Sequence, residues 1–445
     1  MFNNSITGYY SNTKYVFWRK PVFNKLFLFI KSRVWLLPTI FSIGSFFLAV
    51  FVAFLDQFIN LNDTKIIKAF LTIDRDLAQT ILSTIAGSLL TMTTITFSTI
   101  MVVLTTYSSQ FSPRTLQNFI RDMVTMRVLG IFIGGFVYSI FSLLFMKQES
   151  ESYVLAVTIS VIIASVCVGV FAYFIHHVAS SVRVSKLIEQ LSNDVLKSIH
   201  NKISKVEKSD HVILVTSTPS AYKFSKEIEI TNNDFGYIQL IDEEKLYKQA
   251  CEEDYFIEIH HPIGSFLPPD KLVMTIHHNG VADNKELEEI TLGNERTTMQ
   301  DIDFGLQKLT EVALRAISPG INDPNTAIDC IRNLGLCLKK VSSLDANYLA
   351  YYKDNIVVLS IPQRPFEEVL RSCFYQICHY GQKDISILEA IFDALLEIST
   401  SNTKEIIEKT VQFSEYILEK ADIHSFPELD QRSLKDRKKR LVNQK

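Results

Sequence analysis

The chain has 445 residues, of which 47% are hydrophobic, and a formal net charge of −3. This length allows a membrane domain together with one or two further domains. The near-neutral charge and the lack of a basic stripe with interleaved aromatic residues argue against nucleic acid as a partner. The six cysteines form no CxxC pair, so they suit a reducing compartment better than a disulfide framework.

A basic segment covers residues 1–33 and is followed by four long apolar runs within 34–176. Each run has about 20 predominantly apolar residues or more, the length that crosses a hydrocarbon core of about 30 Å. The runs cover residues 34–55, 79–107, 127–146 and 153–175. We therefore expect four transmembrane helices with the lipid bilayer as a partner. The Lys and Arg residues concentrated before Val34 predict that both termini are cytoplasmic.

The second run carries a stripe of small and hydroxylated residues at alternating spacings of three and four. On a helix this spacing keeps them on one face. Such a face either lines a polar path shared by several copies of the chain or packs closely against another helix. The residues of this candidate stripe are Thr84, Gly87, Thr91, Thr94 and Ser98.

Small residues also recur in the third and fourth runs, where they predict close helix packing. They are Gly130, Gly134 and Gly135 in the third run, and Ala164, Ser165, Gly169 and Ala172 in the fourth.

Histidine doublets occur three times in the chain. His176 and His177 close the fourth run and form a candidate pH-sensitive pair, because histidine titrates near neutral pH. Anchoring at the membrane surface is the alternative. The doublets His260-His261 and His277-His278 lie on consecutive predicted strands, so one member of each could share a face of the sheet. With Glu258 two residues before His260, this arrangement is compatible with metal ligands or with ordinary polar contacts. The sequence leaves metal binding open.

The sequence after the membrane domain predicts a linker helix, a β-rich domain, a helical domain and a charged tail. Apolar residues at helical spacing predict an amphipathic linker helix within 177–210. Five β-type runs with turn signals between them predict a small β-sandwich or barrel over 211–292. Helical patterns return in 293–425, and a charged tail covers 426–445. The expected fold is an α-helical membrane domain followed by a cytosolic α+β region.

The segment Arg315 to Thr326, RAISPGINDPNT, is the most distinctive part of the C-terminal region. Pro319-Gly320 is expected to end one helix, and Asn322 or Asp323 to cap the next. Backbone amides at a helix start, with an arginine nearby, favour anion binding. The candidate anion or ligand site therefore comprises Arg315, Ser318, Asn322 and Asp323. The alternative pairs Arg315 with Asp323 or Asp329, which would lock the turn.

Four motifs in order carry a family resemblance: SSQFSPR at 108–114, FIHH at 174–177, GYIQLID at 236–242 and the segment from Arg315. Together they resemble the uncharacterised bacterial predicted-membrane-protein family called domain of unknown function 2254. The resemblance covers residues from about Lys31 to Lys340. It implies a multi-pass protein of the bacterial inner membrane with this arrangement of parts, and it supplies no reaction.

Two functional hypotheses follow. The chain has no P-loop, Rossmann fingerprint, nucleophile elbow or HExxH motif, so neither an enzyme nor a cofactor is expected. The first hypothesis is an oligomeric channel-like or transport protein with a cytosolic regulatory region, whose copies turn the hydroxyl stripe toward a shared axis. The second is a membrane-anchored sensor or scaffold whose cytosolic half binds a small ligand or a partner protein.

Overall fold

The computed structural model describes residues 35–58, 74–115, 122–146, 154–219, 224–280 and 288–444. The basic segment predicted at 1–33 lies outside these residues. The chain divides into two compact units. The membrane unit comprises residues 1–104 and 117–177, and the C-terminal unit comprises 105–116 and 178–445.

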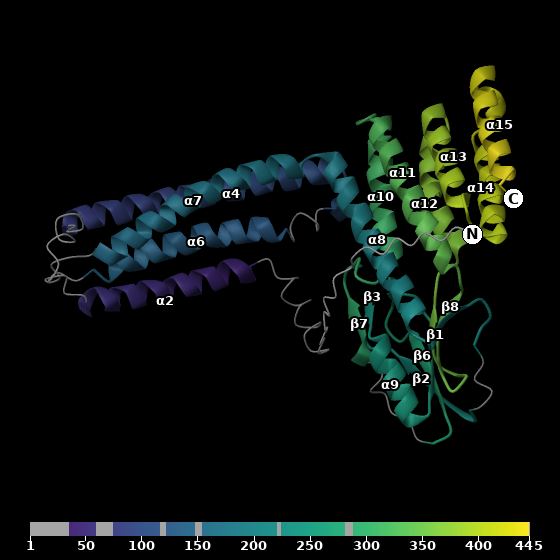
Figure 1. Cartoon of the computed structure of the whole chain (residues 1–445), viewed down its shortest axis with the longest axis horizontal. Coiled ribbons are helices and arrows are strands. Elements are labelled where there is room, and N and C mark those ends of the chain that lie inside the picture. Colours follow the sequence, from purple (N-terminus) through teal and green to yellow (C-terminus); the bar gives the residue numbers. More distant parts are fainter. Residues whose placement is uncertain are drawn as a thin grey trace, which may run out of the picture. The chain divides into compact units, whose positions relative to one another are not determined.

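Four helices lying side by side form the membrane unit (Figure 1). All four are long and apolar enough to cross a membrane, as predicted. They are α2 (Leu36–Phe58), α4 (Arg75–Gln110), α6 (Met123–Leu144) and α7 (Val154–Ser181). The last turns of α4 and α7 belong to the C-terminal unit.

Glycines on α6 allow its backbone to approach its neighbours. A Cβ atom at Gly130 would lie 2.8 Å from the Phe41 ring, and one at Gly134 would lie 2.8 Å from the Ser45 hydroxyl, both on α2. At Gly135 it would lie 2.9 Å from Leu89 on α4 and from Ile163 on α7. The close packing predicted from these three glycines is thereby confirmed. Gly169 on α7 differs, because the space beside it is open.

The C-terminal unit contains a six-stranded sheet and a three-stranded sheet. All neighbouring strands are antiparallel except β4 and β9, which are parallel. The larger sheet has the order β1 (Val212–Val215), β8 (Tyr348–Lys353), β9 (Ile356–Pro362), β4 (Phe256–Ile259), β6 (Leu272–His278), β2 (Lys226–Thr231). The smaller sheet has the order β5 (Phe266–Leu267), β3 (Gly236–Ile241), β7 (Ile290–Gly293).

Four strands were not predicted: β5 and β7, which complete the smaller sheet, and β8 and β9. Strands β8 and β9 lie within 293–425, where only helices were expected, yet they occupy the interior of the larger sheet. Their apolar side chains join the core beneath that sheet, as Leu349, Leu359 and Ile361 illustrate. The β-rich part is therefore assembled from two separate stretches of chain.

The helices described in the C-terminal unit lie beside these sheets or beyond one end of them (Figure 1). Helix α8 buries Leu187, Leu191, Val195 and Ile199 and packs against α10 and α11, as its amphipathic pattern predicts. Within the tail at 426–445, α15 packs on α13. The helices are α8 (Val184–Lys208), α9 (Glu243–Glu253), α10 (Ile302–Ala316), α11 (Pro324–Val341), α12 (Phe366–Gly381), α13 (Ile385–Ser399), α14 (Lys404–Lys420) and α15 (Glu428–Val442).

Replacing Gly134 by leucine tests the close packing of α6 on α2. The larger side chain would collide with Ser45 and is expected to cost about 1–3 kcal/mol. The measurement is thermal unfolding of the detergent-purified chain. Gly169→Leu is the matched control, since nothing lies beside that glycine. Equal melting temperatures for the two variants would contradict the packing.

Candidate functional site

The hydroxyl stripe of α4 is not buried by any part of the chain that the structure describes. Thr84, Gly87, Thr91, Thr94 and Ser98 are all exposed. The hydroxyls of Thr84, Thr91 and Thr94 donate to carbonyl oxygens four residues earlier in the same helix. The buried positions Leu82, Leu89, Thr96 and Ile100 lie on the opposite side of α4. The stripe is therefore an open face.

The two histidines that close the fourth run have different surroundings. His176 is exposed, whereas His177 Nε2 lies 2.8 Å from the carboxylate of Asp122. Asp122 also caps α6 by accepting hydrogen bonds from the N–H groups of Val124 and Thr125. Burial raises the pKa of Asp122, but the hydrogen bonds from Thr125 and His177 outweigh it and hold the pKa below its ordinary value. His177 is therefore paired with Asp122, and the pH-sensitive role of His176 and His177 stays a prediction.

The other histidines make separate polar contacts. His277 lies between Glu258, at 3.3 Å, and Glu227, at 3.6 Å. His260 instead contacts the hydroxyl of Thr275 at 2.7 Å. In the described part of the chain, no group of three or more His, Cys, Asp or Glu residues could hold a metal ion.

The candidate anion site at 315–326 serves to join α10 to α11. Asp323 caps α11 by accepting hydrogen bonds from the N–H and hydroxyl groups of Thr326. Asn322 makes the turn with a φ of 51°, and the Ser318 hydroxyl donates to the Arg315 carbonyl. The predicted helix end and cap are present. Arg315 does not make the predicted pair with Asp323 or Asp329 among the described contacts, and the anion site stays a prediction.

Arg315 binds the end of α4. Its Nε donates to the carbonyl oxygen of Ser109 at 2.8 Å, and Asp329 contacts Arg332 instead. One turn earlier on α10, Glu311 accepts a hydrogen bond from the Ser112 hydroxyl at 2.7 Å. Glu311 also forms an ion pair with Arg114. Two motifs about 200 residues apart in sequence thus meet within the C-terminal unit.

A chain of hydrogen bonds continues from this contact along α10. Glu311 Oε1 accepts from Gln307 at 3.2 Å, and Gln307 Oε1 accepts from Arg296 at 3.0 Å. The same guanidinium donates to both carboxylate oxygens of Asp301, at 2.7 and 2.8 Å. Asp301 is buried and caps α10 through the N–H of Phe304. We call this series Asp301, Arg296, Gln307 and Glu311 the α10 polar chain.

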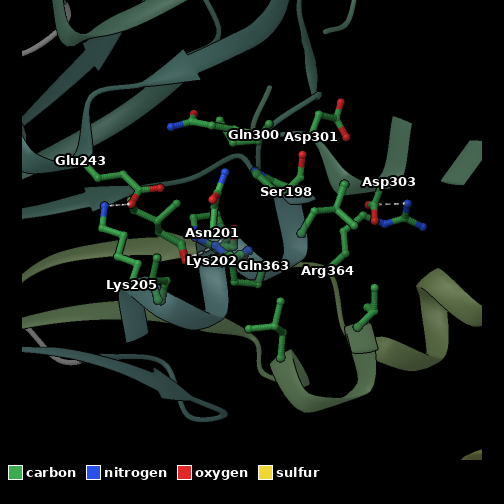
Figure 2. Close-up of a pocket in the computed structure, with 18 of the residues that line it drawn as sticks. Ser198, Asn201, Lys202, Lys205, Glu243, Gln300, Asp301, Asp303, Gln363 and Arg364 are labelled. Atoms are coloured by element: carbon green, nitrogen blue, oxygen red, sulfur yellow. Dashed lines mark hydrogen bonds and ion pairs between the residues drawn. The ribbon is translucent and has the colours of Figure 1, made fainter. Parts of the chain in front are cut away.

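Asp301 lies at the wall of a cavity of about 200 Å³, which we call the Lys202 cavity (Figure 2). Helix α8 contributes four polar residues at spacings that place them on one face: Ser198, Asn201, Lys202 and Lys205. The rest of the wall is largely apolar and includes Ile263, Val341, Leu344, Leu349, Ile361 and Val369. The cavity thus combines a polar helix face with an apolar wall, as ligand sites commonly do.

The wall near Asp301 depends on a glycine. Gly264 follows Pro262 and Ile263, both of which line the cavity. It has a φ of 84°, a conformation that glycine adopts without strain. A Cβ atom there would also collide with the Asp301 carboxylate.

Two ion pairs flank the cavity (Figure 2). Lys205 pairs with Glu243 on one side, and Arg364 pairs with Asp303 at 2.9 Å on the other. Asp303 and Arg364 also line a second cavity of about 490 Å³, where Gln307 and Glu311 lie. The α10 polar chain therefore runs from the wall of the Lys202 cavity along the second cavity to the end of α4.

Lys202 differs from the other cations of the cavity. Among the described residues its ammonium group contacts the side-chain oxygen of Gln363 and has no carboxylate within ion-pair distance. Burial lowers the pKa of Lys202, and this effect outweighs the opposing charges of Glu243 and Asp303. A partly buried ammonium with a neutral partner is available to a bound ligand.

A family model described as a predicted membrane protein, DUF2254, matches residues 31–397. The chain belongs to the DUF2254 family. Both the GYIQLID strand and the contact between Arg315 and the SSQFSPR segment lie inside the matched range. The family resemblance of the sequence is confirmed.

Related proteins extend the comparison but carry no assigned activity in their names. An uncharacterized protein of Mycobacterium bovis is 26% identical over 336 residues, covering 72% of this DUF2254 chain and 64% of the relative. Uncharacterized proteins of two Mycobacterium tuberculosis strains match to the same extent. The chain thus spans 64% of the length of these curated relatives. No solved structure matches the chain.

Sequence reasoning identified both motifs of this DUF2254 protein but not the Lys202 cavity. The apolar positions of α8 predict an amphipathic helix, and its polar residues received no role. One usable signal was present, since Ser198, Asn201, Lys202 and Lys205 follow the i, i+3, i+4, i+7 spacing of a single face.

Glu311→Ala is expected to release residues 112–114 from α10, whereas Arg315 still holds Ser109. The change removes the carboxylate that holds Ser112 and Arg114, at an expected cost of about 1–3 kcal/mol. Trypsin should then cleave faster after Arg114. Asp329→Ala is the control, because the Asp329–Arg332 pair is exposed and contributes little. Unchanged cleavage in Glu311→Ala would show that Glu311 does not hold the segment.

Lys202→Met is expected to stabilise the ligand-free protein near neutral pH, by about 1 kcal/mol or more. The pKa of Lys202 is lowered from 10.5 in the fold, so its charged form opposes folding at every pH below the folded value. The gain should shrink as the pH rises from that value to 10.5. Thermal unfolding across this pH range is the measurement. A destabilised variant, or a gain that grows with pH, would be the contrary result.

Proposed function

We propose that this DUF2254 protein is a membrane-anchored sensor whose C-terminal unit binds a small ligand in the Lys202 cavity. The α10 polar chain is the observation that carries the proposal. It begins at Asp301 in the cavity wall and ends at Ser112 and Arg114, just after α4. A ligand that changes the position of Asp301 would therefore act on the end of a membrane helix.

Helix α8 offers a second connection between the cavity and the membrane helices. Only Val182 and Arg183 separate α8 from α7. Four residues of α8 line the cavity, so a ligand would contact the helix that follows α7 directly in the chain. Such a ligand shifts a conformational equilibrium only if it prefers one state over the other. Through the α10 polar chain and through α8, a ligand with such a preference would change the conformation at the ends of α4 and α7.

We propose ligand binding rather than catalysis at this site. The carboxylates at the cavity wall are each held by a cation: Glu243 by Lys205, Asp303 by Arg364 and Asp301 by Arg296. Carboxylates held in this way suit positioning better than proton transfer. With both termini cytoplasmic, as the charge bias predicts, the cavity would report a ligand inside the bacterial cell.

A cysteine at Ser108 tests the coupling. The residue is exposed and lies just before the α10 contact. In a Cys251→Ser background, a ligand found by thermal-shift screening should change the rate at which Ser108→Cys reacts with a maleimide. Adding Gln307→Leu should abolish this change while ligand binding persists, because the substitution interrupts the α10 polar chain.

Ser198→Trp controls for the location of the site, since it would fill the Lys202 cavity. Loss of ligand binding in this variant is expected. If the ligand still binds, or if labelling of Ser108→Cys is the same with and without ligand, the sensor proposal fails.

An oligomeric channel-like or transport protein is a second candidate, favoured by the open hydroxyl face of α4. Thr91, Thr94 and Ser98 are exposed among the residues that the structure describes. A second copy of the chain could cover this face, because hydroxylated and small residues let helices approach closely in a membrane. Several copies would then surround a path lined by hydroxyl groups.

Cross-linking of single cysteines in membranes tests this candidate. Thr91→Cys is expected to form a cross-linked dimer with a short bismaleimide. Phe97→Cys is the matched control, since Phe97 is also exposed, at 57%, but lies away from the stripe. Equal cross-linking of both variants, or none of Thr91→Cys, would contradict association through the stripe.

A further inference from the structure

We infer that the ligand of the Lys202 cavity carries a carboxylate or phosphate group, and that the ammonium of Lys202 is its counter-ion. This inference rests on the proposed function. It identifies the chemical class of the ligand and the residue that selects it.

The ion pairs of the cavity support an anion. The cations that line it are Lys202, Lys205 and Arg364, and the carboxylates are Glu243, Asp301 and Asp303. Each carboxylate is paired with a cation other than Lys202, since Glu243 pairs with Lys205, Asp303 with Arg364, and Asp301 with Arg296 outside the lining. Among the described residues, Lys202 is therefore the lining cation that has no carboxylate partner (Figure 2).

The surroundings of Lys202 make this charge costly without a ligand. Removing an ammonium from water is unfavourable unless an opposite charge or strong acceptors replace the water. Gln363 supplies one neutral acceptor, and its amide nitrogen is directed to the carbonyl oxygens of Ile361 and Pro362. A bound anion would supply the missing charge.

A neighbouring donor would help to hold the anion. Asn201 precedes Lys202 on α8, and its side chain points into the cavity (Figure 2). Among the described residues this side chain has no hydrogen-bond partner. A carboxylate or phosphate oxygen could accept from both the Asn201 amide and the Lys202 ammonium.

The size and the apolar wall restrict the remainder of the ligand. About 200 Å³ is smaller than the pockets of roughly 300–1,000 Å³ that hold drug-sized molecules. Ile263, Leu349 and Ile361 offer apolar contacts. The cavity therefore suits a small organic acid or a small phosphate ester with a short apolar body.

Butyrate, butyramide and inorganic phosphate are suitable probes, used with the full detergent-purified chain. Butyrate and butyramide have nearly the same shape but differ in charge. At about 20 mM, above the roughly millimolar Kd of so small a probe, butyrate or phosphate should raise the melting temperature and butyramide should not. The anion that raises the melting temperature more would show whether the site prefers a carboxylate or a phosphate ligand.

Substitutions at Lys202 locate the effect. Lys202→Met should weaken binding of the anion at least tenfold, whereas Lys202→Arg should preserve part of it. Lys197→Met is the matched control, because Lys197 lies on α8 but is exposed and does not line the cavity. Equal stabilisation by butyramide, unchanged binding in Lys202→Met, or no stabilisation by either anion would overturn the inference. A neutral ligand that is lost in Ser198→Trp would overturn it while leaving the proposed function intact.

Discussion

The attachment of the end of α4 to α10 is the interaction on which the rest of the structure depends. The last carbonyl groups of a helix lack partners within the helix, and Arg315 supplies donors to the one at Ser109. Glu311 then holds Ser112 and Arg114 just beyond the helix end. Because of these contacts, residues 105–116 belong to the same compact unit as the Lys202 cavity. A membrane helix therefore ends inside the unit that contains the candidate ligand site.

The buried ammonium of Lys202 destabilises the ligand-free protein and is also the group to which a ligand would bind. A partly buried ammonium opposes folding, and Lys202 has only a neutral side chain as its described partner. Groups of this kind cluster at functional sites, where ligand binding recovers the cost. The neighbouring cations are already paired with Glu243, Asp301 and Asp303. Lys202 is therefore the cation that is left to bind a ligand. This arrangement gives the site both its location and its preference for an anion.

Periodicity in the sequence predicted the helices and strands better than it predicted which of them contact one another. The four apolar helices and the strands from β1 to β4 and β6 were visible as local patterns. Strands β8 and β9 form a hairpin with a turn at Asp354 and Asn355, so a local signal was present, but it was missed among the helical patterns on either side. Their pairing with β1 and β4 is the part that local patterns do not contain. Likewise, Arg315 and Ser109 are 206 residues apart, and local spacing carries no information about such a contact. Lys202 resembled a solvent-facing lysine because periodicity defines a helix face but not what covers it.

Hydrogen exchange of the end of α4 tests most directly whether the α10 polar chain links it to the cavity. The comparison is between the native chain and Gln307→Leu, which interrupts the chain between Arg296 and Glu311. The account predicts faster exchange at the amides of Arg114 and Thr115, which donate to Ser112, and unchanged exchange in α13. Identical exchange at both amides in the two proteins would contradict it.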